Sequence, residues 1–348
     1  MRTTTTRDIA LPLLVLAALA CLPLLGPPDY FMHLAITTIL VALACTAWAL
    51  MGRFGIVSFG HGAFLGVAAY SMALLWNLQG ITPWIGLPVG VALAALAGAL
   101  LGWPAFRLRV VGHYFALVTL AAGEIVRILI TALRSITGGS LGMTPNQAPP
   151  AEAFAAMQMS KAGFWWLGLL AWACGLLAWR LLDRSMTSKA LAAVAEDEDA
   201  AASIGIRVAR EKLKVTLLSA ALAGLAGGLT AQYRMYLNPE TLSGLGVSLQ
   251  IVFGAIAGGM YSLIGPTIGA VFTIGLDETL RIGFGTQFIG AAPLIYGLLL
   301  VLFVLFLPRG IAGLLERRRR RPGHDVPAAV ARGAPGDVAV PATEPPRA

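Results

Sequence analysis

Two charged residues stand inside an otherwise apolar segment of this sequence, where ionisable side chains are uncommon. Glu124 and Arg127 are three positions apart, a spacing that makes them neighbours on one face of a helix. An ionisable group deep in a hydrophobic segment is energetically costly and usually faces the interior of a helical bundle. The simplest interpretation is that the two charges neutralise each other. The alternative is that they line a path for a polar solute or an interface between subunits.

A second candidate is the glycine-rich stretch Gly60-His61-Gly62, which follows Ser58. Glycine breaks a helix within a membrane only where the freed backbone groups lie against protein or a water-filled cavity. The N-terminus of a broken helix presents N–H dipoles that suit a carboxylate, such as that of an amino acid. We therefore assign the glycines to a solute pathway and interpret His61 as a packing residue hydrogen-bonded to a neighbouring carbonyl.

The third candidate is the polar segment 183–214, which separates two blocks of hydrophobic sequence. It contains the pattern Asp199-Ala200-Ala201-x-x-x-Gly205 within an acidic run. Thr187 or Ser188 is a candidate N-cap, residues 189–204 favour one helix, and Gly205 suits its C-terminal end. A docking element for another protein and an ordinary solvated connection between helices fit this spacing equally well.

Enzyme chemistry is not indicated by the sequence. It contains no Gly-x-x-x-x-Gly-Lys-Ser/Thr loop that could hold nucleotide phosphates, and no arrangement of nucleophile, base and orienting group. Cys21, Cys45 and Cys174 lie in apolar segments without metal-ligand spacing, so we interpret them as small buried residues. We expect neither a metal nor a cofactor in this chain.

The composition indicates that membrane-spanning helices position the candidate residues. Of the 348 residues, 57% are apolar and only 12% are charged, whereas about a quarter of a globular chain is usually charged. Apolar runs of about 20 residues, long enough to cross a bilayer, recur along the sequence. The net charge of +8 does not favour nucleic acid, because most Lys and Arg fall on one side of the predicted topology. We interpret the run Arg317–Arg321 as an anchor to anionic membrane lipid.

We therefore predict an all-α transmembrane bundle of about ten spans, with broken or re-entrant helices and both termini inside. Residues 1–8 are expected to be cytoplasmic, 9–308 to form the transmembrane domain, and 309–348 to form a basic and then disordered cytoplasmic tail. The predicted spans are 9–25, 30–51, 55–76, 84–102, 114–133, 164–182, 215–233, 247–262, 263–280 and 291–307. The short pair 247–262 and 263–280 could instead be re-entrant.

Glycines spaced four apart occur in several predicted spans, among them Gly254/Gly258 and Gly265/Gly269. Glycine on one helical face lets two backbones approach closely, and helices in lipid associate through such contacts. We expect most of these glycines to be packing positions.

Several motifs resemble a known family. The pattern Asp199 to Gly205 resembles the Glu-Ala-Ala-x-x-x-Gly loop of ABC importer permeases, with Asp in place of Glu. Four further motifs look like the branched-chain amino-acid ABC importer permease family, in its larger subunit type: Ser58–Phe64, Tyr114–Leu120 with Gly123–Arg127, Thr137–Gly142, and Phe306–Ile311. They follow the family order and cover about residues 30 to 315. Tyr261 departs from the family, which usually has Gly there.

This resemblance implies a permease subunit that moves branched-chain or related amino acids inward by alternating access. Its implied partners are a sister permease, two cytoplasmic ATPase subunits that bind the ATP, and an extracytoplasmic solute-binding protein, at the bacterial inner membrane. The candidate coupling residues are Leu191, Val194, Glu198, Asp199, Ala200, Ala201 and Gly205. The candidate pathway residues are Ser58, Gly60, His61, Gly62, Glu124, Arg127, Gly138, Gly139, Ser140, Gly258 and Gly259.

The alternative from another class is a secondary transporter driven by an ion gradient, with Glu124 or His61 as proton carrier. A membrane enzyme is disfavoured by the missing catalytic arrangement. The solute stays open among branched-chain amino acids, other amino acids, urea and short amides.

Overall fold

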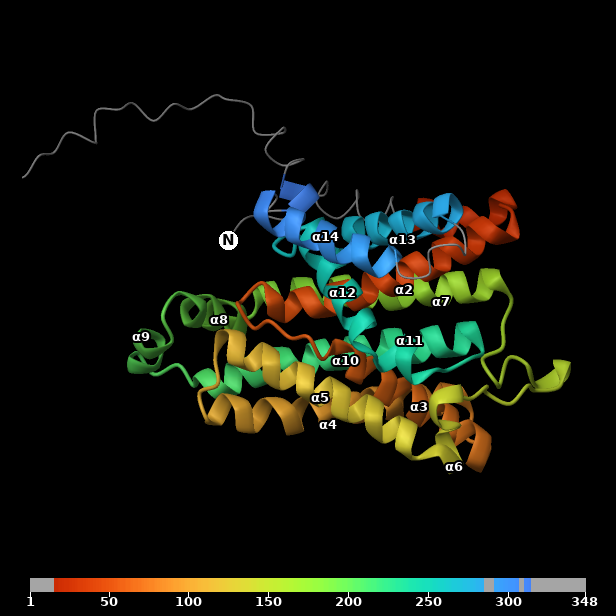
Figure 1. Cartoon of the computed structure of the whole chain (residues 1–348), viewed down its shortest axis with the longest axis horizontal. Coiled ribbons are helices and arrows are strands. Elements are labelled where there is room, and N and C mark those ends of the chain that lie inside the picture. Colours follow the sequence, from red (N-terminus) through yellow and green to blue (C-terminus); the bar gives the residue numbers. More distant parts are fainter. Residues whose placement is uncertain (1–15, 285–290, 307–309, 314–348) are drawn as a thin grey trace, which may run out of the picture.

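The structure is a computed structural model that describes residues 16–284, 291–306 and 310–313. Within these ranges the regular structure is helical, apart from one isolated antiparallel bridge between Met143 and Leu237. The all-α prediction is therefore confirmed for the described part of the chain. Figure 1 shows the long helices running side by side as a bundle.

Six segments of the described chain are long and apolar enough to cross a membrane. They are α2 (Asp29–Gly52), α4 (Pro83–Arg107), α5 (Gly112–Ala132), α7 (Lys161–Arg184), α10 (Val208–Arg234), and Pro239–Gly258, which combines α11 (Pro239–Ser243) with α12 (Leu245–Gly258). The predicted count of ten spans is not confirmed. Residues 9–15 of the first predicted span, 9–25, lie outside the described residues; its described part, 16–25, ends in η1 (Leu22–Leu25), a short 3-10 helix.

The remaining long helices are α3 (His61–Gln79), α13 (Gly265–Phe284) and α14 (Ala291–Phe306). The predicted irregularity of residues 55–76 is confined to the stretch before His61, after which α3 is continuous. The break that the sequence analysis missed lies at Gly244, whose extended backbone (φ −65°, ψ 159°) separates α11 from α12. With 14 residues, α12 alone is about 21 Å long, too short for a full crossing.

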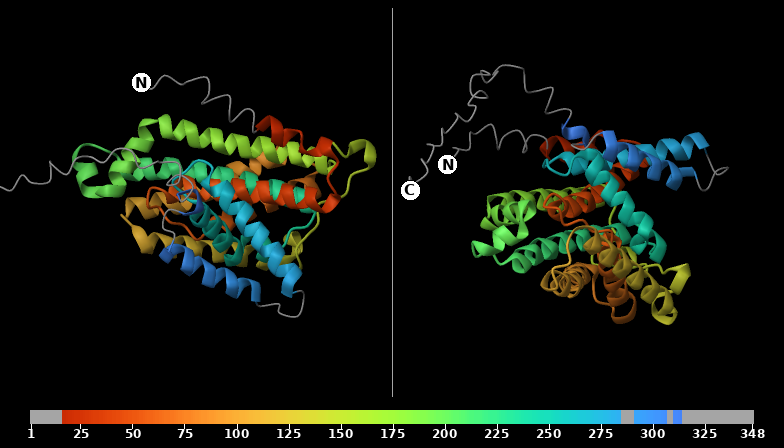
Figure 2. Two further views of the ribbon diagram at one scale, coloured as in Figure 1. Left: turned by 90° about the horizontal axis from the view of Figure 1, so that it is seen from above. Right: turned by 60° about the vertical axis from the view of Figure 1, so that its left-hand side comes forward.

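The core of the bundle lies around α10, which packs against α2, α3 and α4. In turn α2 packs against α7, α12 and α13, and its side chains Leu43, Trp48 and Leu50 are fully buried. A helix that is apolar on all sides, as α2 is, becomes stable by burial within other helices. Figure 2 shows α13 and α14 on one side of this centre and α3, α4 and α5 on the other.

Two groups of connecting segments mark opposite ends of the bundle (Figure 1). One end carries α8 (Met186–Glu196) and α9 (Glu198–Ser203), both within the predicted segment 183–214. The other end carries the connection from α5 to α7, with its short elements α6 (Arg134–Thr137), η2 (Gly139–Leu141) and η3 (Pro150–Glu152).

The hairpin of α12 and α13 is held by contacts between glycine backbones, as the four-residue spacing predicts. A Cβ atom added at Gly258 would overlap the carbonyl oxygen of Gly265, and one added at Gly269 would overlap that of Gly254. Tyr261 lies exposed in the turn between the two helices. The departure from the family at Tyr261 therefore leaves the close approach intact.

This contact generates a prediction about stability. Gly269→Ala is expected to destabilise the protein by about 1–3 kcal/mol, because the new methyl group must push the α12 backbone away. Gly275→Ala is the matched control, since Gly275 lies on the same helix with open space around its Cα. Thermal unfolding in detergent measures the difference. Equal midpoints for the two variants would contradict the packing role of Gly269.

Candidate functional site

The polar segment forms two helices where the sequence predicted one. Ser185, rather than Thr187 or Ser188, caps α8, because its hydroxyl accepts a hydrogen bond from the Ser188 N–H. Asp197 interrupts the predicted helix 189–204 with an extended backbone (φ −154°, ψ 115°), and its carboxylate accepts the N–H groups of Asp199 and Ala200. An Asp side chain that bonds its own backbone in this way favours a helix start over a helix interior.

The end of α9 agrees with the prediction for Gly205. Gly205 has φ +92°, a conformation that costs glycine little. The N–H of Gly205 donates to Ala202 and that of Ile206 donates to Ala201. This pair of hydrogen bonds is a Schellman motif, which ends a helix at a glycine. A Cβ atom on Gly205 would meet nothing within 4 Å, so this corner is open.

Buried side chains fix these two helices to the bundle. Leu191 and Val194 of α8 and Ala201 of α9 are buried, and α8 packs against both α7 and α10. Leu191 and Val194 are thus anchors, while Ala200 and Gly205 are exposed.

Ion pairs add to this attachment. The Lys212 Nζ atom of α10 lies 2.5 Å from a Glu198 carboxylate oxygen, and the pair is largely buried. Arg109 and Asp199 form an exposed pair at 3.2 Å, which contributes little to stability. Arg53, just after α2, pairs with Asp183 at 2.6 Å. Burial lowers the pKa of Arg53 from its ordinary value while Asp183 opposes the shift, and the guanidinium stays charged.

A hollow of about 530 Å³ lies beneath Gly205, between α8 and the start of α10. Its charged lining side chains are Lys189, Arg207, Arg210, Glu211 and Lys214. The segment 183–214 therefore presents a mainly basic recess beside an acidic turn that contains Glu198 and Asp199.

The predicted pathway residues at the start of α3 lie in a buried hydrogen-bond network. Ser58 and His61 are 1% and 0% exposed. The His61 ring contacts the Ser58 hydroxyl at 3.2 Å through Nδ1 and the Ser219 hydroxyl at 2.9 Å through Nε2. The Trp48 indole donates to the Ser58 carbonyl at 2.7 Å. The predicted carbonyl partner of His61 is therefore replaced by two hydroxyls, one of them on α10.

This network assigns the tautomer of His61. The Ser219 hydroxyl donates its hydrogen to the Ala47 carbonyl at 2.6 Å, so toward His61 its oxygen accepts. Nε2 therefore carries the imidazole hydrogen and Nδ1 accepts from Ser58, whose oxygen accepts the Gly60 N–H. In this arrangement each of the two hydroxyls serves as both donor and acceptor.

Two helix breaks meet beside this network. A Cβ atom on Gly60 would overlap the carbonyl oxygen of Thr119 on α5, and the Thr119 hydroxyl accepts the Phe59 N–H at 3.1 Å. The Gly62 N–H donates to the Ser248 hydroxyl of α12 at 2.9 Å. A Cβ atom on Gly62 would crowd the carbonyl of Gly244, the residue that separates α11 from α12. Side chains thus satisfy the N–H groups of Phe59, Gly60 and Gly62 at the break before His61.

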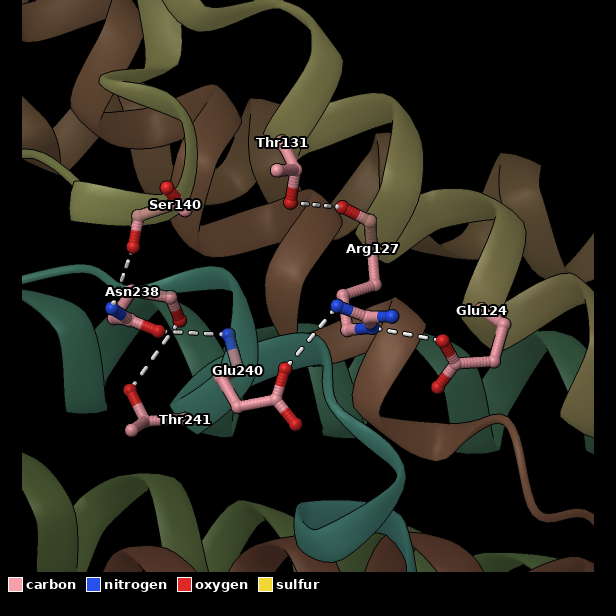
Figure 3. Close-up of polar contacts among 7 residues, drawn as sticks. All are labelled: Glu124, Arg127, Thr131, Ser140, Asn238, Glu240 and Thr241. Carbon is pink, nitrogen blue, oxygen red and sulfur yellow. Dashed lines mark hydrogen bonds and ion pairs between the residues drawn. The ribbon is translucent and has the colours of Figure 1, made fainter.

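Glu124 and Arg127 form the expected ion pair, and a third charge joins them (Figure 3). The Arg127 Nε atom lies 2.8 Å from Glu124, and an Nη atom lies 3.3 Å from Glu240 of α11. The side chains of Glu124 and Arg127 are about one-third exposed, and that of Glu240 is 71% exposed. The group has two carboxylates for one guanidinium, and it opens onto the surface of the isolated chain.

The predicted Gly138-Gly139-Ser140 turn lies near this triad (Figure 3). Gly138 and Gly139 both have positive φ. The Ser140 carbonyl accepts from the Asn238 amide at 3.2 Å, and Asn238 caps α11 by accepting the Glu240 N–H at 2.8 Å. The turn therefore helps to hold the helix that carries Glu240.

Gly258 and Gly259 lie apart from these groups, at the opposite end of α12 from Gly244. Gly259 has φ +113°, and a Cβ atom on Gly310 would press against its backbone. In the described structure, Gly258 therefore packs against the backbone of α13, and Gly259 packs against Gly310. Within the described residues no group of three or more His, Cys, Asp or Glu could hold a metal ion.

Several partners in these clusters were not predicted from the sequence. Ser219 and Ser248 lie on helices remote in sequence from the residues they contact, while Lys212 lies 14 residues from Glu198 on the next helix. All three are residue types that are common on helices. Asn238 and Glu240 carried a usable signal, because Asn-Pro-Glu is typical of a capped helix start.

Apolar helices of membrane-spanning length, with polar side chains gathered at the helix breaks, define a multi-pass membrane protein. A sequence profile described as the branched-chain amino acid transport system / permease component matches residues 29–307. The chain belongs to this family of ABC transporter permeases, as its motifs predict.

Three relatives illustrate the range of the family. The high-affinity branched-chain amino acid transport system permease protein LivM of Escherichia coli (strain K12) is 31% identical over 297 residues, which are 79% of this chain and 68% of LivM. The probable branched-chain permease LivH of Methanocaldococcus jannaschii is 28% identical, with 76% of this chain and 85% of LivH covered. The autoinducer 2 import system permease LsrC of Enterobacter sp. (strain 638) is 26% identical, with 79% of each covered. No solved structure matches the chain.

The hydrogen bonds of His61 generate a prediction. His61→Leu is expected to destabilise the protein by about 1–3 kcal/mol for each hydroxyl left without its partner. His61→Gln is the matched variant, because its amide N–H can replace the Nε2 donation to Ser219. Thermal unfolding in detergent should give a smaller loss for His61→Gln. A midpoint of His61→Leu equal to wild type would contradict the buried network.

Proposed function

We propose that the chain is a permease subunit of an ATP-driven importer and moves branched-chain or related amino acids inward by alternating access. The observation that carries this proposal is the α8–α9 segment, anchored to the bundle on one side and open on the other. Family membership supports it, and so does the position of the segment at one end of the bundle (Figure 1).

In this proposal the α8–α9 segment receives mechanical work from a cytoplasmic ATPase subunit. Leu191, Val194 and Ala201 connect it rigidly to α7 and α10, so a push on α9 moves these long helices. Glu198 transmits the same push through its buried ion pair with Lys212. Asp199, Ala200 and Gly205 stay available for the partner, because they are exposed.

The solute pathway is proposed to pass the triad of Glu124, Arg127 and Glu240. Their charged side chains open onto a face of α5 where Ile125, Ile128 and Leu129 are also exposed. Charged groups do not face lipid within a membrane without a large cost. This face is therefore assigned to an interface with a sister permease, where water and a zwitterionic solute would meet the triad. The nearby helix breaks at Gly60 and Gly244 support this position of the pathway.

The remaining partners follow from the same proposal. Two cytoplasmic ATPase subunits would bind the ATP, a solute-binding protein would deliver the solute on the other side, and the assembly would lie in the bacterial inner membrane. No cofactor is assigned to this chain. LivM and LivH are named for branched-chain amino acids and LsrC for autoinducer 2. The solute-binding protein is therefore proposed to make most of the choice of solute.

Coupling through the α8–α9 segment is testable at Gly205. Gly205→Val forces a β-branched residue into φ +92° and should distort the end of α9. We expect uptake by the assembled importer in proteoliposomes to fall at least about tenfold while ATP hydrolysis continues, because the two activities become uncoupled.

Gly80→Val is the matched control for this variant. Gly80 also has positive φ and open space around it, but it follows α3 at the other end of the bundle. Normal uptake by Gly205→Val, or equal losses in both variants, would contradict the coupling role. Uptake by the chain alone under a proton gradient would overturn the ATP-driven assignment.

The pathway role of the triad is testable at Glu124. Glu124→Gln keeps the shape of the side chain but leaves Arg127 with only Glu240, so uptake should fall at least about tenfold with assembly intact. Glu278→Gln is the control, because Glu278 and Arg281 form an ion pair of the same spacing on α13. Uptake assays in proteoliposomes compare the two. Normal uptake by Glu124→Gln would rule out an essential charge at this position.

A further inference from the structure

A second hollow lies at the α8–α9 end of the bundle, between the C-terminal end of α4 and the N-terminal end of α10. Its volume is about 490 Å³, and it is lined by Trp103, Arg107, Arg207, Val208, Ala209, Arg210 and Leu213. No carboxylate is among these residues. Across the described part of the chain, Arg107, Arg207 and Arg210 form no ion pair with an acidic side chain. Three cations around one hollow repel each other, so the site favours an anion.

An exposed apolar stripe on α4 leads into this hollow. Leu96, Leu100, Trp103 and Arg107 are spaced four, three and four residues apart, which places them on one helical face. Leu96, Leu100 and Trp103 are 52%, 68% and 53% exposed. The Arg107 guanidinium lies over the Trp103 ring, 5.0 Å from its centre. Tryptophan concentrates where a membrane meets water, so the stripe passes from hydrocarbon to the headgroup level at Trp103.

We propose that this hollow binds an anionic phospholipid, with the headgroup phosphate on Arg107, Arg207 and Arg210 and an acyl chain along Leu96 and Leu100. Guanidinium groups bind phosphate through paired, charge-assisted hydrogen bonds. The N-terminus of the 27-residue α10 adds a partial positive charge, and no side chain caps it.

The apolar stripe decides between the possible sources of the phosphate. A free phosphate or a nucleotide would use the arginines but not Leu96 and Leu100. The continuity of the stripe with the arginines fits one molecule that has both a charged head and a hydrocarbon tail. Arg207 and Arg210 also line the recess beneath Gly205, whereas Trp103 and Arg107 of α4 line this hollow and not that recess. The lipid proposal does not depend on the proposed roles of the triad or of the α8–α9 segment.

The test uses the full-length chain, purified in detergent and freed of lipid. Native mass spectrometry measures the binding of phosphatidylglycerol and of the zwitterionic phosphatidylcholine. Phosphatidylglycerol is expected to bind more tightly. Replacing all three arginines by Gln (Arg107→Gln, Arg207→Gln, Arg210→Gln) should weaken its binding on the order of a hundredfold, since each cation near a membrane surface contributes about a factor of five.

The matched control removes the same charge at the same end of the molecule. Arg180→Gln, Arg184→Gln and Lys189→Gln replace three basic residues that do not line this hollow. This control should bind phosphatidylglycerol within about twofold of wild type. Leu100→Gln is a second variant. It is expected to weaken the binding of phosphatidylglycerol but to leave unchanged the effect of inorganic phosphate on thermal unfolding.

Four outcomes would overturn the proposal. Equal binding of the two lipids would show that the site does not prefer an anionic headgroup. Equal loss of phosphatidylglycerol binding in the two triple variants would show that the three arginines form no specific site. Stabilisation by inorganic phosphate alone that matches phosphatidylglycerol would indicate a free anion. A triple-arginine variant that keeps its lipid but no longer captures the ATPase subunit would indicate a protein interface. Thermal unfolding without lipid confirms that each variant is folded, and the single variants Arg207→Gln and Arg184→Gln replace the triple-arginine variant and its control if either triple variant is not.

Discussion

Within a membrane, every backbone N–H and C=O group must find a hydrogen-bond partner in the protein, and this requirement organises the centre of the molecule. Two helix breaks, before His61 and at Gly244, would leave such groups without partners. At the break before His61, the hydroxyls of Thr119, Ser58 and Ser248 accept the N–H groups of Phe59, Gly60 and Gly62. Because these hydroxyls come from the α2–α3 connection, α5 and α12, the breaks hold the elements of the bundle together.

The long helix α10 connects the separate clusters. Near its start, Lys212 pairs with Glu198 of α9. Two turns further along, Ser219 joins the His61 network, and near its end Gln232 donates to the Ala156 carbonyl in the connection at the far end of the bundle. The single helix α10 therefore contacts the α8–α9 segment, the network beside the helix breaks, and the connection at the other end of the bundle. A displacement applied at α9 has a direct mechanical route to the breaks through this helix.

The sequence predicted features that depend on neighbouring residues. The apolar runs located the helices, the spacing of Glu124 and Arg127 predicted their ion pair, and Gly205 marked the end of α9. The prediction failed where one side chain overrides the helix propensity of the residues around it. Asp197 interrupts an alanine-rich stretch of high helix propensity, because its carboxylate accepts the N–H groups of Asp199 and Ala200 and so starts a new helix.

Local sequence patterns could not predict contacts between residues on helices far apart in the sequence. Nothing near His61 in the sequence points to Ser219, and nothing near Arg127 points to Glu240, since these contacts span 158 and 113 residues. Gly244 resembles the chain's many other glycines, so only the three-dimensional arrangement distinguishes a helix break from a packing position.

The hydrogen bonds through His61 all run in one direction, from the Gly60 N–H through Ser58, the imidazole and Ser219 to the Ala47 carbonyl. A chain that starts at an amide and ends at a carbonyl leaves none of the hydroxyl or imidazole groups between them without a hydrogen-bond partner. Both of its ends are also buried. This polar seam therefore completes the hydrogen bonds beside the break before His61 with protein groups alone, so the break can stay dry within the bundle.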